Sequence, residues 1–148
     1  MRVSPQISTL VAYKAGKPIA ETQREYGVSK VIKLASNENP LGTSPKVIEA
    51  LKKAASEVHR YPDPSCFELI DVIHKKWSLP KNRIAIGNGS NEIIDLLIRI
   101  FCEPTEKILT TQSAFVAYQI CAQAARVETI FAPMKSGFQT DLKSFSDI

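Results

Sequence analysis

A glycine-rich turn between two apolar segments constrains this chain more than any other feature. The turn spans residues 87–92, follows the apolar stretch 84–86 and precedes an amphipathic stretch that ends at Phe101. A strand, a glycine turn and a helix start in this order are typical of an anion site, because the first N–H groups of the helix point at the ligand. Ser90 is suited to cap this helix. A plain strand-to-helix turn explains the same residues, since short glycine motifs are weak evidence.

The composition fits a folded domain with its own core. The 148 residues are 44% hydrophobic and 23% charged, and no apolar run approaches the roughly 20 residues of a membrane helix. The N-terminus lacks the apolar core of a signal peptide. Cys66, Cys102 and Cys121 are widely spaced and form neither a CxxC pair nor a zinc pattern. We therefore expect no metal site, no membrane association and a reducing, cytoplasmic location.

The net charge of +4 comes from the N-terminal part of the chain. Residues 1–60 carry ten Lys/Arg against five Asp/Glu, whereas the remainder carries nine against ten. The basic residues are dispersed and have no interleaved aromatic residues, which argues against a nucleic-acid-binding surface. A phosphorylated small molecule is compatible with this charge.

Helix signals dominate residues 44–80. Ser44 followed by Pro45 is a typical helix start, and we expect that helix to end by Tyr61. Ser65 and Glu68 form a capping-box pattern at the start of a second helix, which Pro80 ends. Upstream, residues 1–35 show little periodicity. Residues 13–18 are expected to form a turn or an extended arm, and residues 33–35 a short strand followed by a loop.

Strand and helix signals alternate from residue 83 onward. We expect strands at 83–86, 107–111 and 127–132, separated by helices at 91–101 and 114–125, with a further helix beginning near Asp141. Such alternation predicts an α/β fold with a mostly parallel sheet. The apolar residues expected to face inward from the first of these helices are Ile94, Leu97, Ile98 and Phe101. Because residues 144–148 contain no stop signal, we expect the chain to be cut and not complete.

Four segments resemble one family in order and spacing. They are Tyr13-Lys-Ala-Gly-Lys-Pro, Lys33-Leu-Ala-Ser-Asn-Glu-Asn-Pro-Leu-Gly, Arg60-Tyr-Pro-Asp and Gly87-Asn-Gly-Ser-Asn-Glu-Ile-Ile. The chain resembles the N-terminal part of the histidinol-phosphate aminotransferases, which are fold-type-I, pyridoxal-phosphate-dependent enzymes. The resemblance implies an incomplete fold-type-I large domain, in which three mostly parallel strands with helices are preceded by an N-terminal arm and a small-domain segment. It divides the chain into residues 1–60 and 61–148.

The resemblance also implies a cofactor site. Ser90 and Asn91 would hold the phosphate of pyridoxal phosphate, and Phe115 would stack on its pyridine ring. Tyr61 would reach the cofactor phosphate of the neighbouring subunit in a homodimer. Each residue has a plainer interpretation: Ser90 as an N-cap, Phe115 as a core residue beside Tyr118, and Tyr61 as a surface side chain.

The remaining implied contacts lie on the substrate side. Tyr13, Asn37 and Glu38 resemble the substrate-side arm and loop, although turn packing and Asx-turn formation explain them as well. His59 and His74 have no role in the family and are expected to be solvated helix residues. No catalytic residue is expected in this chain, because the resemblance places the covalent lysine and its acidic partner beyond position 148.

The implied function is transfer of an amino group between glutamate and imidazole-acetol phosphate in histidine biosynthesis. We expect the chain alone to be inactive and to self-associate through uncovered apolar surface. Two alternatives remain. One is another pyridoxal-phosphate-dependent aminotransferase or decarboxylase of the same fold type, and the other is a non-catalytic binding or interaction remnant.

Overall fold

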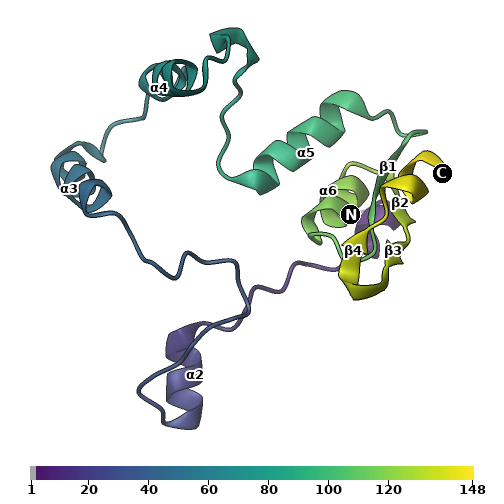
Figure 1. Ribbon diagram of the computed structural model, residues 1–148, viewed down its shortest axis with the longest axis horizontal. Helices are drawn as coiled ribbons and strands as arrows, with labels where there is room; N and C mark the ends of the chain where they lie inside the picture. Colours follow the sequence, from purple (N-terminus) through teal and green to yellow (C-terminus); the bar gives the residue numbers. More distant parts are fainter. Residues whose placement is uncertain (1–2) are drawn as a thin grey trace. The chain divides into compact units, whose positions relative to one another are not determined.

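A computed structural model describes residues 3–148, which divide into two units. One unit joins the N-terminal residues as far as Lys14 to Ala85–Ile148, and the other is Ala15–Ile84. The predicted division at residue 60 stays a prediction. Each unit is described separately below, with its helices and strands labelled as in Figure 1.

The first unit is built on a strand–helix–strand element (Figure 1). Strands β1 (Lys107–Thr111) and β2 (Glu128–Ala132) pair in parallel, from Lys107 opposite Glu128 to Thr111 opposite Ala132. Helix α6 (Ala117–Ala124) connects them, as a parallel pair requires. Two of the three expected strands and their parallel pairing are therefore confirmed, as is the α/β class.

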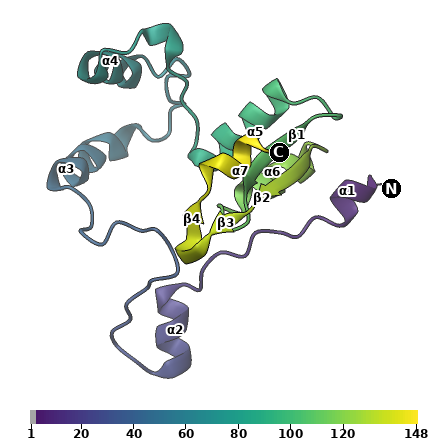
Figure 2. The ribbon, with the colours of Figure 1, turned by 45° about the vertical axis from the view of Figure 1, so that its right-hand side comes forward.

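A short hairpin follows β2 and was not predicted (Figure 2). Strands β3 (Met134–Lys135) and β4 (Gln139–Thr140) pair antiparallel around a 3₁₀ turn, η3 (Ser136–Phe138). Gly137 occupies a left-handed conformation with φ of 74° in that turn. Helix α7 (Leu142–Ser146) comes next, and the Asp141 carboxylate caps it by accepting the Lys143 N–H, which confirms the helix start expected there.

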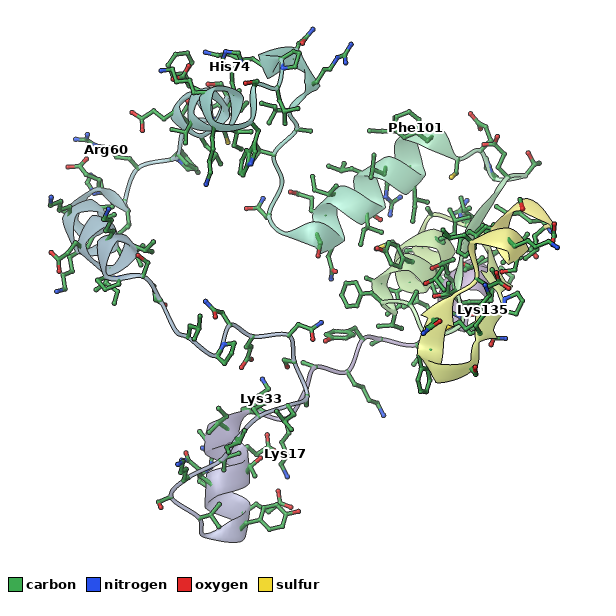
Figure 3. All side chains as sticks on the ribbon, viewed as in Figure 1. Lys17, Lys33, Arg60, His74, Phe101 and Lys135 are labelled. Carbon is green, nitrogen blue, oxygen red and sulfur yellow. The ribbon has the colours of Figure 1, made fainter. Side chains whose placement is uncertain are left out.

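The core of this unit is small and lies between α6, β2 and α5 (Ser90–Phe101). Its buried centre consists of Ile98, Ala122 and Val127, with Ile94 and Ile108 packed against it. The expectation that Leu97 and Phe101 also face inward is wrong, because they are 49% and 73% exposed. Figure 3 shows Phe101 at the C-terminal end of α5. Leu97 lines a cavity beside Ile98 and Ile108 and stays half-exposed, so helical periodicity alone overestimated the buried face.

The strand expected at residues 83–86 does not form. Arg83 ends a 3₁₀ turn, η2 (Lys81–Arg83), and Ile84 is extended, with φ of −115° and ψ of 121°. Backbone extension becomes a strand only when a neighbouring strand supplies the hydrogen-bond ladder. Among the described residues β1 pairs with β2 alone, and residues 84–86 have no ladder partner. The short strand expected at residues 33–35 is absent for the same reason.

The second unit holds the helices expected between residues 44 and 80. Helix α3 (Pro45–Ala54) begins with Pro45, as predicted, and continues as a 3₁₀ turn, η1 (Ala55–Glu57). Helix α4 (Phe67–Trp77) begins two residues later than its predicted cap. The Asp63 carboxylate accepts the N–H of Phe67, the first residue of α4, at 3.0 Å, and the N–H of Ser65, which precedes the helix, at 2.9 Å. These bonds, that of Phe67 foremost, hold the pKa of Asp63 below its ordinary value.

Two N-terminal helices were not predicted from the sequence. Helix α2 (Ile19–Tyr26) starts after Pro18 and ends at Gly27, whose φ of 64° is a left-handed C-cap that glycine adopts without strain. Helix α1 (Pro5–Ser8) belongs to the other unit and packs on α6. Both are short, so neither contains enough turns to show a helical period. Within residues 3–148, no helix has the length and apolarity needed to cross a bilayer.

Candidate functional site

The glycine turn opens α5 with unusual backbone geometry. Gly89 is the N-cap residue, with φ of 84° and ψ of 173°, a region that only glycine adopts at low cost. Its N–H donates to the Gly87 carbonyl at 2.9 Å, which closes the turn. Ser90 is the first residue of the helix, and no side chain caps this end. The expectation that Ser90 is the N-cap is therefore wrong, because Gly89 takes that position.

The first turn of α5 presents free backbone donors. No described residue accepts a hydrogen bond from the N–H groups of Ser90, Asn91 and Glu92, which precede the first intrahelical bond. The side chains of all three are exposed. The dipole of a 12-residue helix adds partial positive charge at this end. This arrangement suits a doubly charged, hydrogen-bond-accepting group such as a phosphate.

One acidic side chain holds the turn that precedes these donors. The Glu92 carboxylate accepts the Asn88 N–H at 2.5 Å, and the Asn88 side-chain amide at 3.3 Å. Sequence reasoning missed this contact, although Glu92 stands three residues after the N-cap, where a capping-box glutamate is expected. A Cβ on Gly87 would lie 2.9 Å from the same carboxylate and 2.7 Å from Ile93 Cδ1. Close approach, and not a positive φ, explains glycine at position 87.

An exposed aromatic ring lies just before α6 in the same unit. Phe115 is 46% exposed and meets two tyrosine rings edge-on. The ring centroids of Tyr13 and Tyr118 are each 6.4 Å away, at interplanar angles of 80° and 83°. Edge-to-face contacts of this kind help to fix the orientation of the rings. The structure thus brings together Tyr13 and Phe115, which are 102 positions apart in the chain.

Helices α5 and α6 pack against each other. The free donors lie at the start of α5, and Phe115 lies just before α6. The Cys121 thiol of α6 lies 4.0 Å from the Asn91 carbonyl oxygen at the start of α5. Burial raises the pKa of that thiol, and the charge of Asp95 adds to the rise, which Arg99 partly offsets. Arg99 itself pairs with Asp95 at 2.7 Å. The thiol is therefore a packed, neutral group at ordinary pH.

The arm that carries Tyr13 is tied to α6 by one side chain. The Gln123 amide donates to the Gln6 carbonyl at 2.8 Å and to the Thr9 hydroxyl at 3.2 Å. A cavity of about 490 Å³ lies between the arm and α6. No sequence motif indicated these contacts, since they join residues more than 110 positions apart.

Three expected site residues belong to the other unit. Tyr61 is fully exposed, and Asn37 is exposed as well. Glu38 pairs with Lys33 at 2.7 Å, and Lys33 is labelled in Figure 3. Their assigned roles stay predictions. His59, just after η1, faces the carbonyl oxygen of Ser56 at 3.0 Å, and His74, in the last turn of α4, faces that of Leu79 at 2.6 Å.

Comparisons with known proteins place the chain in a family. The model of the family "Aminotransferase class I and II" matches residues 29–148. A histidinol-phosphate aminotransferase of Bdellovibrio bacteriovorus is 52% identical over 147 residues, which are 99% of this chain and 40% of that protein. One from an Anaeromyxobacter species is 46% identical over 140 residues, 95% of this chain and 38% of that protein. The chain thus spans about 40% of the length of the curated relatives it matches.

The fold comparison agrees. The crystal structure of histidinol-phosphate aminotransferase from Sinorhizobium meliloti, in complex with pyridoxal-5'-phosphate, superposes with a TM-score of 0.76. At 20% identity the match covers 91% of this chain and 35% of that one. An aspartate aminotransferase of Thermotoga maritima gives a TM-score of 0.71 at 17% identity and covers 99% of this chain and 42% of that one. The incomplete fold-type-I architecture is thereby confirmed, and the chain belongs to the class I and II aminotransferases.

Proposed function

We propose that this chain forms the phosphate-holding and ring-holding part of a pyridoxal phosphate site. The complete enzyme would transfer an amino group between glutamate and imidazole-acetol phosphate in histidine biosynthesis. The names of the relatives that match nearly the whole chain support this substrate assignment. The S. meliloti structure, solved with pyridoxal-5'-phosphate, supports the cofactor.

One observation carries the proposal. Three free N–H groups at the start of α5 and the exposed ring of Phe115 occur in one unit, on or beside helices that pack against each other. A phosphate ester needs several donors and a region of positive potential, which the start of α5 supplies. A flat heteroaromatic ring needs an apolar face to lie against, which Phe115 offers. The residues present therefore fit both ends of this cofactor.

Each residue has a defined task in this proposal. When bound, pyridoxal phosphate supplies the electron sink that stabilises a substrate carbanion. The N–H groups of Ser90 and Asn91 hold the phosphate, and Phe115 fixes the tilt of the ring. Tyr13 packs against Phe115 in a T-shaped arrangement and lies on the arm where substrate contact is proposed.

The second unit would contribute to the same enzyme. Asn37 and Glu38 would contact the substrate, and Tyr61 would donate a hydrogen bond to the cofactor phosphate of a second subunit in a homodimer. Full exposure leaves the phenol of Tyr61 free to act in this way. All three cysteines are free thiols, which suits the reducing cytoplasm that we propose as the location.

The 148-residue chain is expected to show no transaminase turnover by itself. The family resemblance assigns no residue here to the covalent lysine, so these residues bind and orient without completing the reaction. Purified chain, pyridoxal phosphate, glutamate and a keto acid are incubated together. Turnover that exceeds the protein-free background and survives further purification would contradict this assignment.

Binding is tested on the isotope-labelled chain by following amide shifts during titration with pyridoxal phosphate and with inorganic phosphate. Both ligands should shift the Ser90, Asn91 and Glu92 amides, with millimolar affinity. Phe115→Leu removes the stacking face, so it should weaken pyridoxal phosphate about 2- to 12-fold, the equivalent of about 0.5–1.5 kcal/mol. Inorganic phosphate should bind as before.

Helix α4 provides an internal control, because the carboxylate of Asp63 already occupies its N-terminus. The Phe67 amide should therefore stay unshifted by either ligand. Saturable binding elsewhere on a folded sample, with silent Ser90 and Asn91 amides, would overturn the phosphate assignment. If Phe115→Leu weakens the binding of both ligands equally, the stacking assignment alone is overturned.

A further inference from the structure

The glycine turn before α5 is held by three independent constraints. The Gly89 N–H donates to the Gly87 carbonyl, and Gly89 adopts its glycine-only conformation. The third constraint is a side chain, because Glu92 reaches back from the first turn of α5 to the Asn88 N–H at 2.5 Å. The first two constraints come from the backbone, and only the third depends on the functional group of a side chain.

Glycine at position 87 belongs to the same arrangement. An added Cβ would approach the Glu92 carboxylate to 2.9 Å and Ile93 Cδ1 to 2.7 Å, and side-chain carbons essentially never come so close. The carboxylate and the Ile93 side chain thus pack over a bare backbone. A larger residue at position 87 would require the Glu92 carboxylate and the end of the Ile93 side chain to shift.

This contact divides the donors at the helix start into two groups. Glu92 satisfies the Asn88 N–H, which precedes the N-cap, and leaves the N–H groups of Ser90, Asn91 and its own residue free. A carboxylate in the first helical turn also complements the positive end of the dipole. The acidic side chain therefore orders the turn without occupying the donors that face a ligand.

We propose that Glu92 is the positioning residue of the phosphate turn: its carboxylate oxygen, acting as a hydrogen-bond acceptor on Asn88, holds residues 87–89 so that the following N–H groups converge on a phosphate. The ligand half of this inference rests on the proposed function. An acceptor oxygen is enough to hold the Asn88 N–H, so glutamine serves where alanine fails.

Glu92→Gln and Glu92→Ala separate these two properties. Glutamine keeps an acceptor oxygen, whereas alanine removes it. Asn88 amide hydrogen exchange, measured without ligand, should stay slow in Glu92→Gln and accelerate about 2- to 12-fold in Glu92→Ala, as expected for one net hydrogen bond. Inorganic phosphate, followed at the Ser90 and Asn91 amides, should bind Glu92→Gln at least as tightly as the wild type. It should bind Glu92→Ala about 2- to 12-fold more weakly.

Glu106→Ala is the matched control. The Glu106 carboxylate accepts the Glu103 N–H at 2.7 Å, so it makes the same kind of contact in the loop after α5. Its removal should speed exchange at Glu103 and leave both Asn88 exchange and phosphate affinity unchanged. This variant shows whether any loss of a loop carboxylate disturbs the site.

The outcomes separate the inference from the proposed function. The positioning role would be overturned if Asn88 exchange were unchanged in Glu92→Ala. It would also be overturned if both Glu92 variants bound phosphate more tightly, because the carboxylate would then be competing with the ligand. No phosphate response in the wild type, together with faster Asn88 exchange in Glu92→Ala, would overturn the proposed function and leave the ordering of the turn by Glu92 intact.

Discussion

Replacing Gly89 with alanine should damage the candidate site through the backbone alone. Gly89 has φ of 84° and ψ of 173°, and nothing lies within 4 Å of a Cβ built at this position. The alanine side chain therefore meets no steric obstacle, and the cost comes from forcing a Cβ-bearing residue into a glycine-only region. Such strain costs about 1–3 kcal/mol, and the turn should relieve it by rotating away from its native dihedral angles.

Hydrogen exchange and phosphate titration report on this substitution together. Gly89→Ala should accelerate exchange of the hydrogen-bonded Asn88 and Ile93 amides and abolish the phosphate response at Ser90 and Asn91. Gly27→Ala is the control, since Gly27 also has a positive φ and open space for a Cβ, but lies at the end of α2 in the other unit. Native exchange and native phosphate shifts in Gly89→Ala would refute the reasoning from its dihedral angles.

Four further substitutions test the packing and the charges. Ile98→Ala should cost about 2–5 kcal/mol in urea unfolding because Ile98 is buried at the core centre, whereas Leu97→Ala, at a half-exposed site, should cost less than the core change. Gln123→Ala should free the N-terminal arm and speed exchange of α1 amides without unfolding β1 and β2. Asp71 accepts from Lys75 and Lys81, which lower its pKa to about 2, so its stabilising contribution should be full above its ordinary pKa of 3.8 and be lost as pH falls toward 2. Carbon-detected titration of its carboxyl measures this directly, and Asp71→Asn should remove the dependence.

Local signals in the sequence predicted the elements that depend on local chemistry. Pro45 begins α3, and β1 covers the predicted residues 107–111. The helix start near Asp141 is also correct, because aspartate at an N-cap needs only the N–H groups two or three residues onward. Parallel pairing followed from the helix between two apolar strands, which is a topological rule.

The wrong predictions concern elements that need contacts with residues distant in the sequence. Residues 84–86 have the composition of a strand but no described partner strand, so they form no ladder. Phe101 has the spacing of a core residue, yet burial depends on another element to cover it. Ser65 fits a capping box, but the N-cap is Cys66, and the Asp63 carboxylate accepts the N–H of Phe67, the first residue of α4.

The candidate site was predicted in part for the same reasons. The glycine turn is local, so its position at the start of α5 was evident, although Gly89 and not Ser90 is the N-cap. The contact of Tyr13 with Phe115 joins distant parts of the chain, and neither composition nor spacing encodes it. The Glu92 contact was not predicted, because glutamate stands three residues after the N-cap only when Gly89, and not Ser90, takes that position.

A chimaeric enzyme tests the proposed cofactor site most directly. This chain would replace the matching N-terminal portion of the B. bacteriovorus histidinol-phosphate aminotransferase, to which it is 52% identical. We expect the purified chimaera to bind pyridoxal phosphate and to transaminate histidinol phosphate, and Gly89→Ala within it to weaken cofactor binding. A folded chimaera that neither takes up pyridoxal phosphate nor transaminates, beside an active parent enzyme, would contradict the proposed site.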